Sequence, residues 1–144
     1  MEGVNLYQLK HINVPKGDVY HALKSTDLGF KGFGEAYFSK IKNGQIKGWK
    51  KHNRLTLNLI VFFGKIKFII YDDRKESLTC GEFKEFILSP DENHSRLNVA
   101  PGLWMAFAGM SAEESILLDI INEPHDSAES ERKELEEIPY NFNI

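Results

Sequence analysis

The chain has 144 residues, of which 42% are hydrophobic and 12% aromatic. This length suits one hydrophobic core, so we expect a single domain over residues 1–144, and the composition excludes a disordered chain. No stretch approaches the roughly 18 apolar residues of a membrane span, the first residues lack an export signal, and Cys80 is the only cysteine. We therefore expect a cytoplasmic protein without disulfides and without a membrane partner.

The formal net charge of −3 hides an uneven distribution. Residues 123–144 hold seven acidic residues against Arg132 and Lys133, which gives this segment −5 and leaves +2 for the rest of the chain. Residues 40–54 contain six basic residues and no acidic one. An anionic partner and an ordinary solvated strand face both explain such a run, although it lacks the interleaved arginine and aromatic residues of a nucleic-acid module.

The hydrophobic pattern predicts a series of short strands. The firmest is Leu55–Phe63, where every odd position is apolar, and Gly64-Lys65 then leads to a second apolar run at 66–71. This pair predicts a β-hairpin. Further strands are expected at residues 46–51, 82–88, 96–99, 103–107 and 115–121. Strands at intervals of about ten residues indicate a sandwich or small barrel. Residues 127–137 fit either a short helix or a loosely held acidic tail.

Four fragments carry a family resemblance: residues 33–39 (FGEAYFS), 44–52 (GQIKGWKKH), 64–74 (GKIKFIIYDDR) with 77–81 (SLTCG), and 101–107 (PGLWMAF). In order and spacing they resemble motifs of the dTDP-4-dehydrorhamnose 3,5-epimerase family. That resemblance implies an all-β fold, a cupin-type jelly-roll sandwich or barrel with a short acidic C-terminal tail or helix. It also implies a homodimer in which residues 1–40 cover the sheet edge of a neighbouring subunit.

The resemblance also shows which catalytic residues differ. The family's base is a His in the Gly-Leu-His motif, where this chain has Lys50, and counting along the chain places Leu118 where the family has its acid, a Tyr. Lys50 and His52 are therefore the candidate catalytic residues. His52 is the best titratable group, because imidazole titrates near neutrality. If residues 46–51 form a regular strand, Lys47 and Lys51 point away from the face of Lys50.

Phe33, Glu35 and Lys47 are the candidate substrate-binding residues. The family resemblance suggests that Phe33 stacks on a nucleotide base, Glu35 accepts a hydrogen bond from its edge, and Lys47 holds a phosphate. Each also fits an ordinary exposed strand residue. No cluster of His and carboxylate ligands is visible, so we expect no catalytic metal and no cofactor.

Together these features indicate a nucleotide-sugar epimerase or isomerase of surface polysaccharide biosynthesis with an altered catalytic set. A sugar-nucleotide or glycan-binding cupin without catalysis is the alternative.

Overall fold

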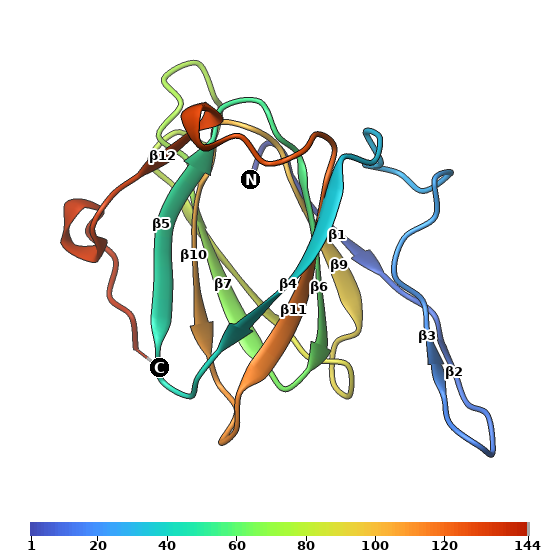
Figure 1. Ribbon diagram of the computed structural model, residues 1–144. Helices are drawn as coiled ribbons and strands as arrows, with labels where there is room; N and C mark the ends of the chain where they lie inside the picture. Colours follow the sequence, from blue (N-terminus) through green and yellow to red (C-terminus); the bar gives the residue numbers. More distant parts are fainter. Residues whose placement is uncertain (144) are drawn as a thin grey trace.

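The computed structural model describes residues 1–143, and two five-stranded antiparallel sheets dominate it (Figure 1). The first sheet has the order β1-β9-β6-β11-β4, and the second has the order β12-β5-β10-β7-β8. The strands of the first sheet are β1 (Val4–Gln8), β4 (Glu35–Ile41), β6 (Leu57–Phe63), β9 (Ser95–Val99) and β11 (Ser115–Ile121). Those of the second are β5 (Ile46–His52), β7 (Ile66–Tyr71), β8 (Phe83–Leu88), β10 (Trp104–Gly109) and β12 (Ser130–Arg132). This arrangement confirms the expected all-β sandwich.

The main core lies between the two sheets. Apolar side chains from both inner faces are completely or almost completely buried there, including Leu59, Phe68 and Leu97. Burying each such side chain contributes about 1.5–3 kcal/mol, so these strands associate through their inner faces. At one end the inner face carries polar side chains, and the core opens into a cavity.

The predicted β-hairpin between residues 55–63 and 66–71 is wrong. Both segments are strands, but β6 lies in the first sheet and β7 in the second. The chain therefore crosses between the sheets at Gly64-Lys65, where the hydroxyl of Ser115 accepts from the Lys65 amide at 3.1 Å. An added Cβ on Gly64 would lie 2.4 Å from that hydroxyl, so the close passage requires glycine here.

The C-terminal segment does not form the α-helix that residues 127–137 suggested. It consists of two short 3₁₀ turns, η1 (Ser127–Glu129) and η2 (Leu135–Glu137), with β12 between them. Beyond β12 it packs on the outer face of the second sheet, where Trp49 and Ile138 are almost fully buried in a second hydrophobic cluster. The acidic tail is thus anchored by its apolar residues.

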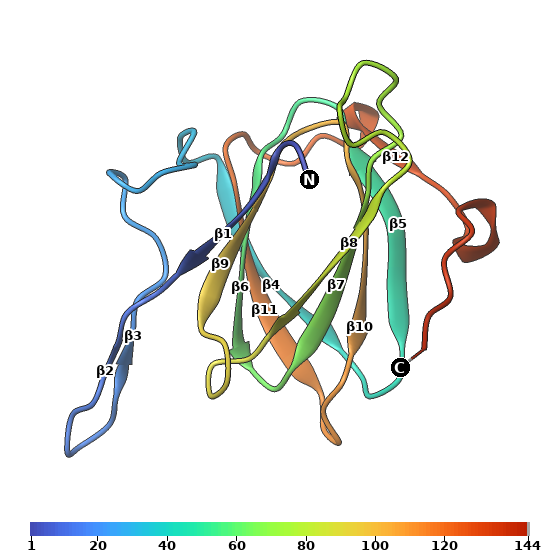
Figure 2. The same cartoon turned by 180° about the vertical axis from the view of Figure 1, so that it is seen from behind.

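The N-terminal segment is divided between the body and a projecting arm. β1 pairs with β9 of its own sheet, so this part folds back on its own subunit. Residues 9–22 then leave the body as a two-stranded arm formed by β2 (His11–Ile12) and β3 (Val19–Tyr20), best seen from behind in Figure 2. Within residues 1–143, no helical segment has the length and apolar character needed to cross a membrane.

Candidate active site

A β-bulge in β5 places three basic side chains on one face. Lys47 pairs with Phe107 and Lys50 with Met105, so three steps along β5 correspond to two along β10. The extra residue shifts the alternation of side chains, and Lys47, Lys50 and His52 all line the cavity. The expectation that Lys47 points away from Lys50 is therefore wrong. Lys51 does point away, with its ammonium 4.7 Å from the Trp104 ring centroid.

The strand β12 brings part of the acidic tail to the cavity. It pairs with β5 in antiparallel register, with Ser130 opposite His52 and Arg132 opposite Lys50. The backbone groups of Trp49 and Lys133 exchange two further hydrogen bonds, at 3.0 and 3.1 Å. This pairing fixes Glu129 behind His52 and sets Arg132 at the rim of the cavity.

His52 and Glu129 form a buried hydrogen-bonded pair, in which Nδ1 of His52 contacts Oε1 of Glu129. The other oxygen, Oε2, accepts from the backbone amides of Asn53, Arg54 and Leu55 at 3.0–3.3 Å. Burial alone would raise the pKa of Glu129, but the bonds from His52 and from backbone amides outweigh it and lower the pKa. Glu129 is consequently a carboxylate, an acceptor only.

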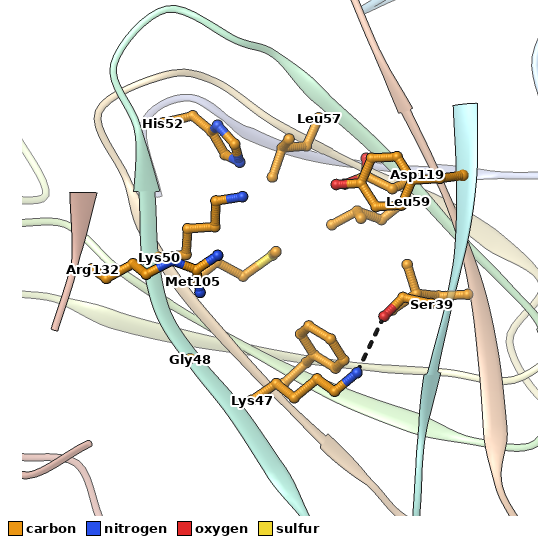
Figure 3. Close-up of a pocket in the computed structure, with 13 residues that line it drawn as sticks. Ser39, Lys47, Gly48, Lys50, His52, Leu57, Leu59, Met105, Asp119 and Arg132 are labelled. Atoms are coloured by element: carbon orange, nitrogen blue, oxygen red, sulfur yellow. Dashed lines mark hydrogen bonds between the residues drawn. The ribbon is translucent and has the colours of Figure 1, made fainter. Parts of the chain in front are cut away.

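An acceptor at Nδ1 determines the tautomer of His52. The imidazole carries its proton on Nδ1 and leaves Nε2 as the basic nitrogen, and no hydrogen bond from Nε2 occurs within residues 1–143. Burial lowers the pKa of His52, and the charge of Lys50 lowers it further. The hydrogen bond to Glu129 raises the pKa, but by less than burial lowers it. The ring is therefore neutral at pH 7 and directed toward the cavity (Figure 3).

The facing wall carries a second pair, which comes from β4 and β11. The Tyr37 hydroxyl lies 2.8 Å from Oδ2 of Asp119. Burial raises the pKa of Asp119 to about 7. Burial also raises the pKa of Tyr37, and the charge of Asp119 adds to the effect. At neutral pH the carboxyl group of Asp119 is consequently divided between its protonated and ionised forms.

The cavity between these walls has a volume of about 180 Å³ and an apolar floor that includes Leu57, Leu59 and Met105. The ammonium of Lys50 points into it beside His52, and Arg132 lies behind Lys50 (Figure 3). Burial lowers the pKa of Lys50, and the charge of Arg132 lowers it further. Lys47 reaches across to the other sheet, with its Nζ atom 2.6 Å from the carbonyl oxygen of Lys40 and 3.4 Å from the hydroxyl of Ser39.

Two of the predicted binding residues do not line this cavity. Phe33 precedes β4 with its side chain 68% exposed. Glu35, two residues before Tyr37 on the same strand, accepts a hydrogen bond from the backbone amide of His125 at 2.8 Å. The structure thus brings together Lys47, Lys50 and His52, and leaves Phe33 and Glu35 outside the cavity lining.

Leu118, the residue expected at the position of the family's acid, does not line the cavity either. Leu117 and Asp119 line the cavity, so Leu118 faces the opposite side of the first sheet, where it pairs with Phe38. Counting residues along the chain therefore selects a side chain on the face of the sheet that is turned away from the cavity. Asp119 is the polar group that β11 presents at this place.

Sequence reasoning missed Glu129, Arg132, Tyr37 and Asp119. The strand period does place Tyr37 and Ser39 on the same face of β4, and Asp119 is the single charged residue within the apolar run 115–121. A charged residue inside a buried strand is a usable signal for a functional group. No local signal marks Glu129, because its partner His52 is 77 residues away in the chain.

The arrangement is suited to proton transfer. A neutral imidazole with a carboxylate behind it can remove a proton from a bound molecule, and the carboxylate then stabilises the imidazolium. The ammonium of Lys50 lies where it can stabilise negative charge that develops on the ligand. The described residues include no group of three His, Cys, Asp or Glu side chains arranged to hold a metal ion.

The fold is a cupin-type sandwich with a cavity lined by basic side chains. The known proteins that resemble this chain are sugar isomerases and epimerases. It is 32% identical to a dTDP sugar isomerase from Desulfovibrio desulfuricans G20, with a TM-score of 0.93 over 97% of this chain and 90% of the other. The chain therefore belongs to the dTDP-sugar isomerase and epimerase family.

Two further relatives extend this comparison. The first is a probable low-salt glycan biosynthesis epimerase of Haloferax volcanii, 30% identical over 106 residues, which are 73% of this chain and 65% of that protein. The second is a dTDP-4-dehydrorhamnose 3,5-epimerase of Bacillus anthracis, solved with TDP and pyrophosphate bound. Its identity is 20%, its TM-score is 0.85, and the match covers 98% of this chain and 85% of the other, which shows a shared fold. No family model matches the chain.

Proposed function

We propose that this protein is an epimerase or isomerase of a nucleotide-linked 4-keto-6-deoxy sugar in glycan assembly, with His52 as its base. The observation that carries the proposal is the buried His52–Glu129 pair, which leaves Nε2 of a neutral imidazole on the side of the cavity. The family relation supports the choice of substrate, since the relatives include a dTDP sugar isomerase and a probable glycan biosynthesis epimerase.

The reaction begins with loss of a proton from the carbon next to the ketone. His52 takes this proton on Nε2, and the electron pair moves to the carbonyl oxygen to give an enediolate. Returning a proton to the same carbon from the other face gives an epimer. Returning it to the former carbonyl carbon, while the proton of the neighbouring hydroxyl passes to the former carbonyl oxygen, moves the ketone to its neighbour. Both products share the first step, so they share the same base.

The cationic residues have separate roles in this proposal. Lys50 stabilises the enediolate oxygen, because its ammonium is half-buried and adjacent to His52. Its role as a base is the weaker assignment, since a Lys remains mostly protonated unless its pKa falls far below the usual value of about 10.4. Lys47 and Arg132 lie near the rim and suit the diphosphate. Phe33 and Glu35, outside the cavity lining, stay predictions for the nucleoside.

Deuterium exchange tests the proposal. The protein is incubated with dTDP-4-keto-6-deoxyglucose in deuterated buffer, and the signals of the protons at C3 and C5 are followed by NMR. We expect enzyme-dependent loss of at least one of these signals, and the product spectrum separates an epimer from a moved ketone. Absence of exchange with any 4-keto nucleotide sugar would overturn the proposal.

The role of His52 is tested by His52→Asn, which keeps a polar side chain but removes the base. Exchange should fall by about 10²–10⁴-fold, the usual contribution of a positioned base. His11→Gln is the matched control, because His11 lies on the projecting arm, and it should keep the wild-type rate. On the acid side, the wild-type rate should hold down to about pH 6.5 and decline below it, because burial lowers the pKa of His52.

A sugar-nucleotide-binding protein without catalysis is the second candidate. The specific observation in its favour is Lys50 at the position of the family's catalytic His, with Lys47 and Arg132 nearby to hold phosphates. This candidate predicts binding of dTDP in a calorimetric titration together with no deuterium exchange. Exchange that depends on His52 would exclude it.

A homodimer completes the proposal. The arm exposes apolar side chains, with Val19 49% exposed, and the outer face of the first sheet exposes Phe38 (67%) and Phe62 (49%), whose rings contact each other edge to face. Exposed apolar surface of this kind is typical of a protein interface, and two-fold pairing would cover it. Light scattering should give twice the monomer mass at micromolar concentration, and the monomer mass would exclude the dimer.

A further inference from the structure

Asp119 is the buried carboxyl group for which the proposed reaction has not yet assigned a role. Its side chain is 4% exposed, and it sits in the middle of β11 between β4 and β6. Oδ2 contacts the Tyr37 hydroxyl at 2.8 Å, whereas Oδ1 is buried with no hydrogen-bond partner within residues 1–143. An ionised carboxylate in such a place would leave one buried charged oxygen without a donor from the described residues, which costs several kcal/mol.

The groups around Asp119 do not compensate for a negative charge. On β4, Glu35 adds a further negative charge and Tyr37 offers one hydroxyl, while the neighbouring β6 side chains Leu57 and Leu59 are apolar. Across the cavity lie the basic groups of β5 and β12, which are Lys47, Lys50, His52 and Arg132. Of these, Lys50 is the one whose charge acts on Asp119, and no ion pair with Asp119 forms within the described chain. The surroundings therefore favour the protonated carboxyl group.

We propose that Asp119 is a positioning residue, protonated in the resting protein, whose carboxyl O–H donates to the Tyr37 oxygen and so directs the Tyr37 O–H into the cavity. The protonation state decides which way this hydrogen bond runs. An ionised Asp119 can only accept, and it would hold the Tyr37 proton on Oδ2, away from the ligand. The neutral form releases that proton for the ligand.

This inference rests on the proposed function for its catalytic part. Tyr37 lies on the wall opposite β5, so it is placed to return a proton to the enediolate that His52 generates. In that step the Tyr37 O–H bond breaks and a C–H bond forms on the ligand, while Asp119 passes its proton to the Tyr37 oxygen. Asp119 is left as a carboxylate, His52 holds the proton taken from the ligand, and exchange with water restores both groups.

The pH dependence of the rate of product formation, followed by NMR, tests the inference with Asp119→Asn, whose amide donates to Tyr37 as the protonated acid does. The wild-type rate should fall about tenfold per pH unit above about pH 7, as Asp119 ionises. The variant should keep its rate within about threefold between pH 7 and 9. Asp91→Asn, an identical change in an exposed loop, should keep the decline. Tyr37→Phe should lose about 10²-fold at every pH, because the donor itself is gone.

An infrared measurement separates this inference from the proposed function, because it needs no substrate. Protonated carboxyl groups absorb apart from ionised ones, so at pH 6 the wild type should show a carbonyl band that Asp119→Asn lacks and Tyr37→Phe keeps. Absence of that band, or an alkaline decline that persists in Asp119→Asn, would overturn the inference. A band that is present in a protein without exchange activity would overturn the proposed function and leave the Asp119–Tyr37 arrangement supported.

Discussion

The two walls of the cavity each hold a buried carboxyl group, and the two groups behave in opposite ways. Glu129 and Asp119 are both 4% exposed. Glu129 accepts hydrogen bonds from His52 and from three backbone amides, and its pKa is lowered. Among residues 1–143 Asp119 has one hydrogen-bond partner, Tyr37, and burial raises its pKa to about 7. At Glu129 the donors outweigh the effect of burial on the pKa, whereas at Asp119 burial dominates, and this balance decides the charge of each group.

Because the pKa values of Glu129 and Asp119 are shifted in opposite directions, the two walls of the cavity suit different chemical roles. The ionised Glu129 fixes a neutral imidazole and stabilises the charged one, so the β5 wall can take up a proton. In its protonated form Asp119 keeps a proton beside Tyr37, so the β4–β11 wall can give one back. A cavity with one group of each kind suits a reaction in which a proton leaves a carbon and returns from another direction.

Removing Glu129 should have the largest effect. Glu129→Ala leaves Nδ1 of His52 and the backbone amides of residues 53–55 without their acceptor, and each buried donor left unpaired costs about 1–3 kcal/mol of unfolding free energy. Deuterium exchange should also fall by about 10²-fold or more, because the imidazole loses its orientation. Urea unfolding and NMR measure the two effects, and Glu131→Ala, an exposed neighbour, is the control. A stable and fully active variant would show that the pair has neither role.

Replacing Lys50 should have the next largest effect. Lys50→Met keeps the length of the side chain and removes the charge beside His52. Exchange should fall by about 10²-fold, which is typical for loss of one group that stabilises an oxyanion. Lys51→Met, on the outer side of β5, should change the rate little. Lys50→His tests the alternative assignment, because higher activity in that variant would indicate that the wild-type Lys lacks the basicity the site can use.

The stability of Asp119→Asn should differ from that of the wild type in a way that depends on pH. A raised pKa means that the folded state holds its proton more tightly than the unfolded state, so Asp119 reduces stability progressively as the pH rises from about 4 to about 7. Each pKa unit corresponds to about 1.4 kcal/mol, so the rise from 3.8 to about 7 amounts to about 4 kcal/mol. Asp119→Asn should therefore be more stable than the wild type at pH 8 and similar at pH 4. Denaturation at both pH values measures this difference, and equal stability at pH 8 would contradict it.

Leu118→Tyr should have the smallest effect. The side chain faces the outer surface of the first sheet, so a hydroxyl placed there cannot reach the cavity. The exchange rate should stay within about twofold of the wild type by NMR. A clear increase would mean that position 118 does supply the acid, as counting along the chain suggested.

The strand pattern predicted much of the fold and less of the site. Five strands fall within one or two residues of the ranges expected at 46–51, 82–88, 96–99, 103–107 and 115–121. The pattern failed at Gly64-Lys65, because a two-residue link fits both a hairpin and a crossing between sheets. It also failed along β5, where a single bulge reverses which side chains face inward, a change that alternation alone cannot reveal.

The position of the acidic C-terminal tail could not be predicted from its charge. Its charge suggested a loose acidic segment, but the apolar residues Leu135, Ile138, Tyr140 and Phe142 anchor it to the second sheet around Trp49. That contact joins parts of the chain far apart in sequence, and it positions Glu129 next to His52. His52, the proposed base, was therefore visible in the sequence, while its carboxylate partner Glu129 depended on tertiary packing.

The most direct test of the opposite charge states is an NMR titration of protein labelled with ¹³C at the carboxyl groups of Asp and Glu. Glu129→Gln and Asp119→Asn assign the two signals by their disappearance. We predict that Asp119 titrates near pH 7 and that Glu129 stays ionised down to below pH 4.5. Titration of both groups in the ordinary range of about 4 to 4.5, or in the reverse order, would contradict this assignment. The β5 wall would then not be the one that takes up a proton, with the β4–β11 wall returning one.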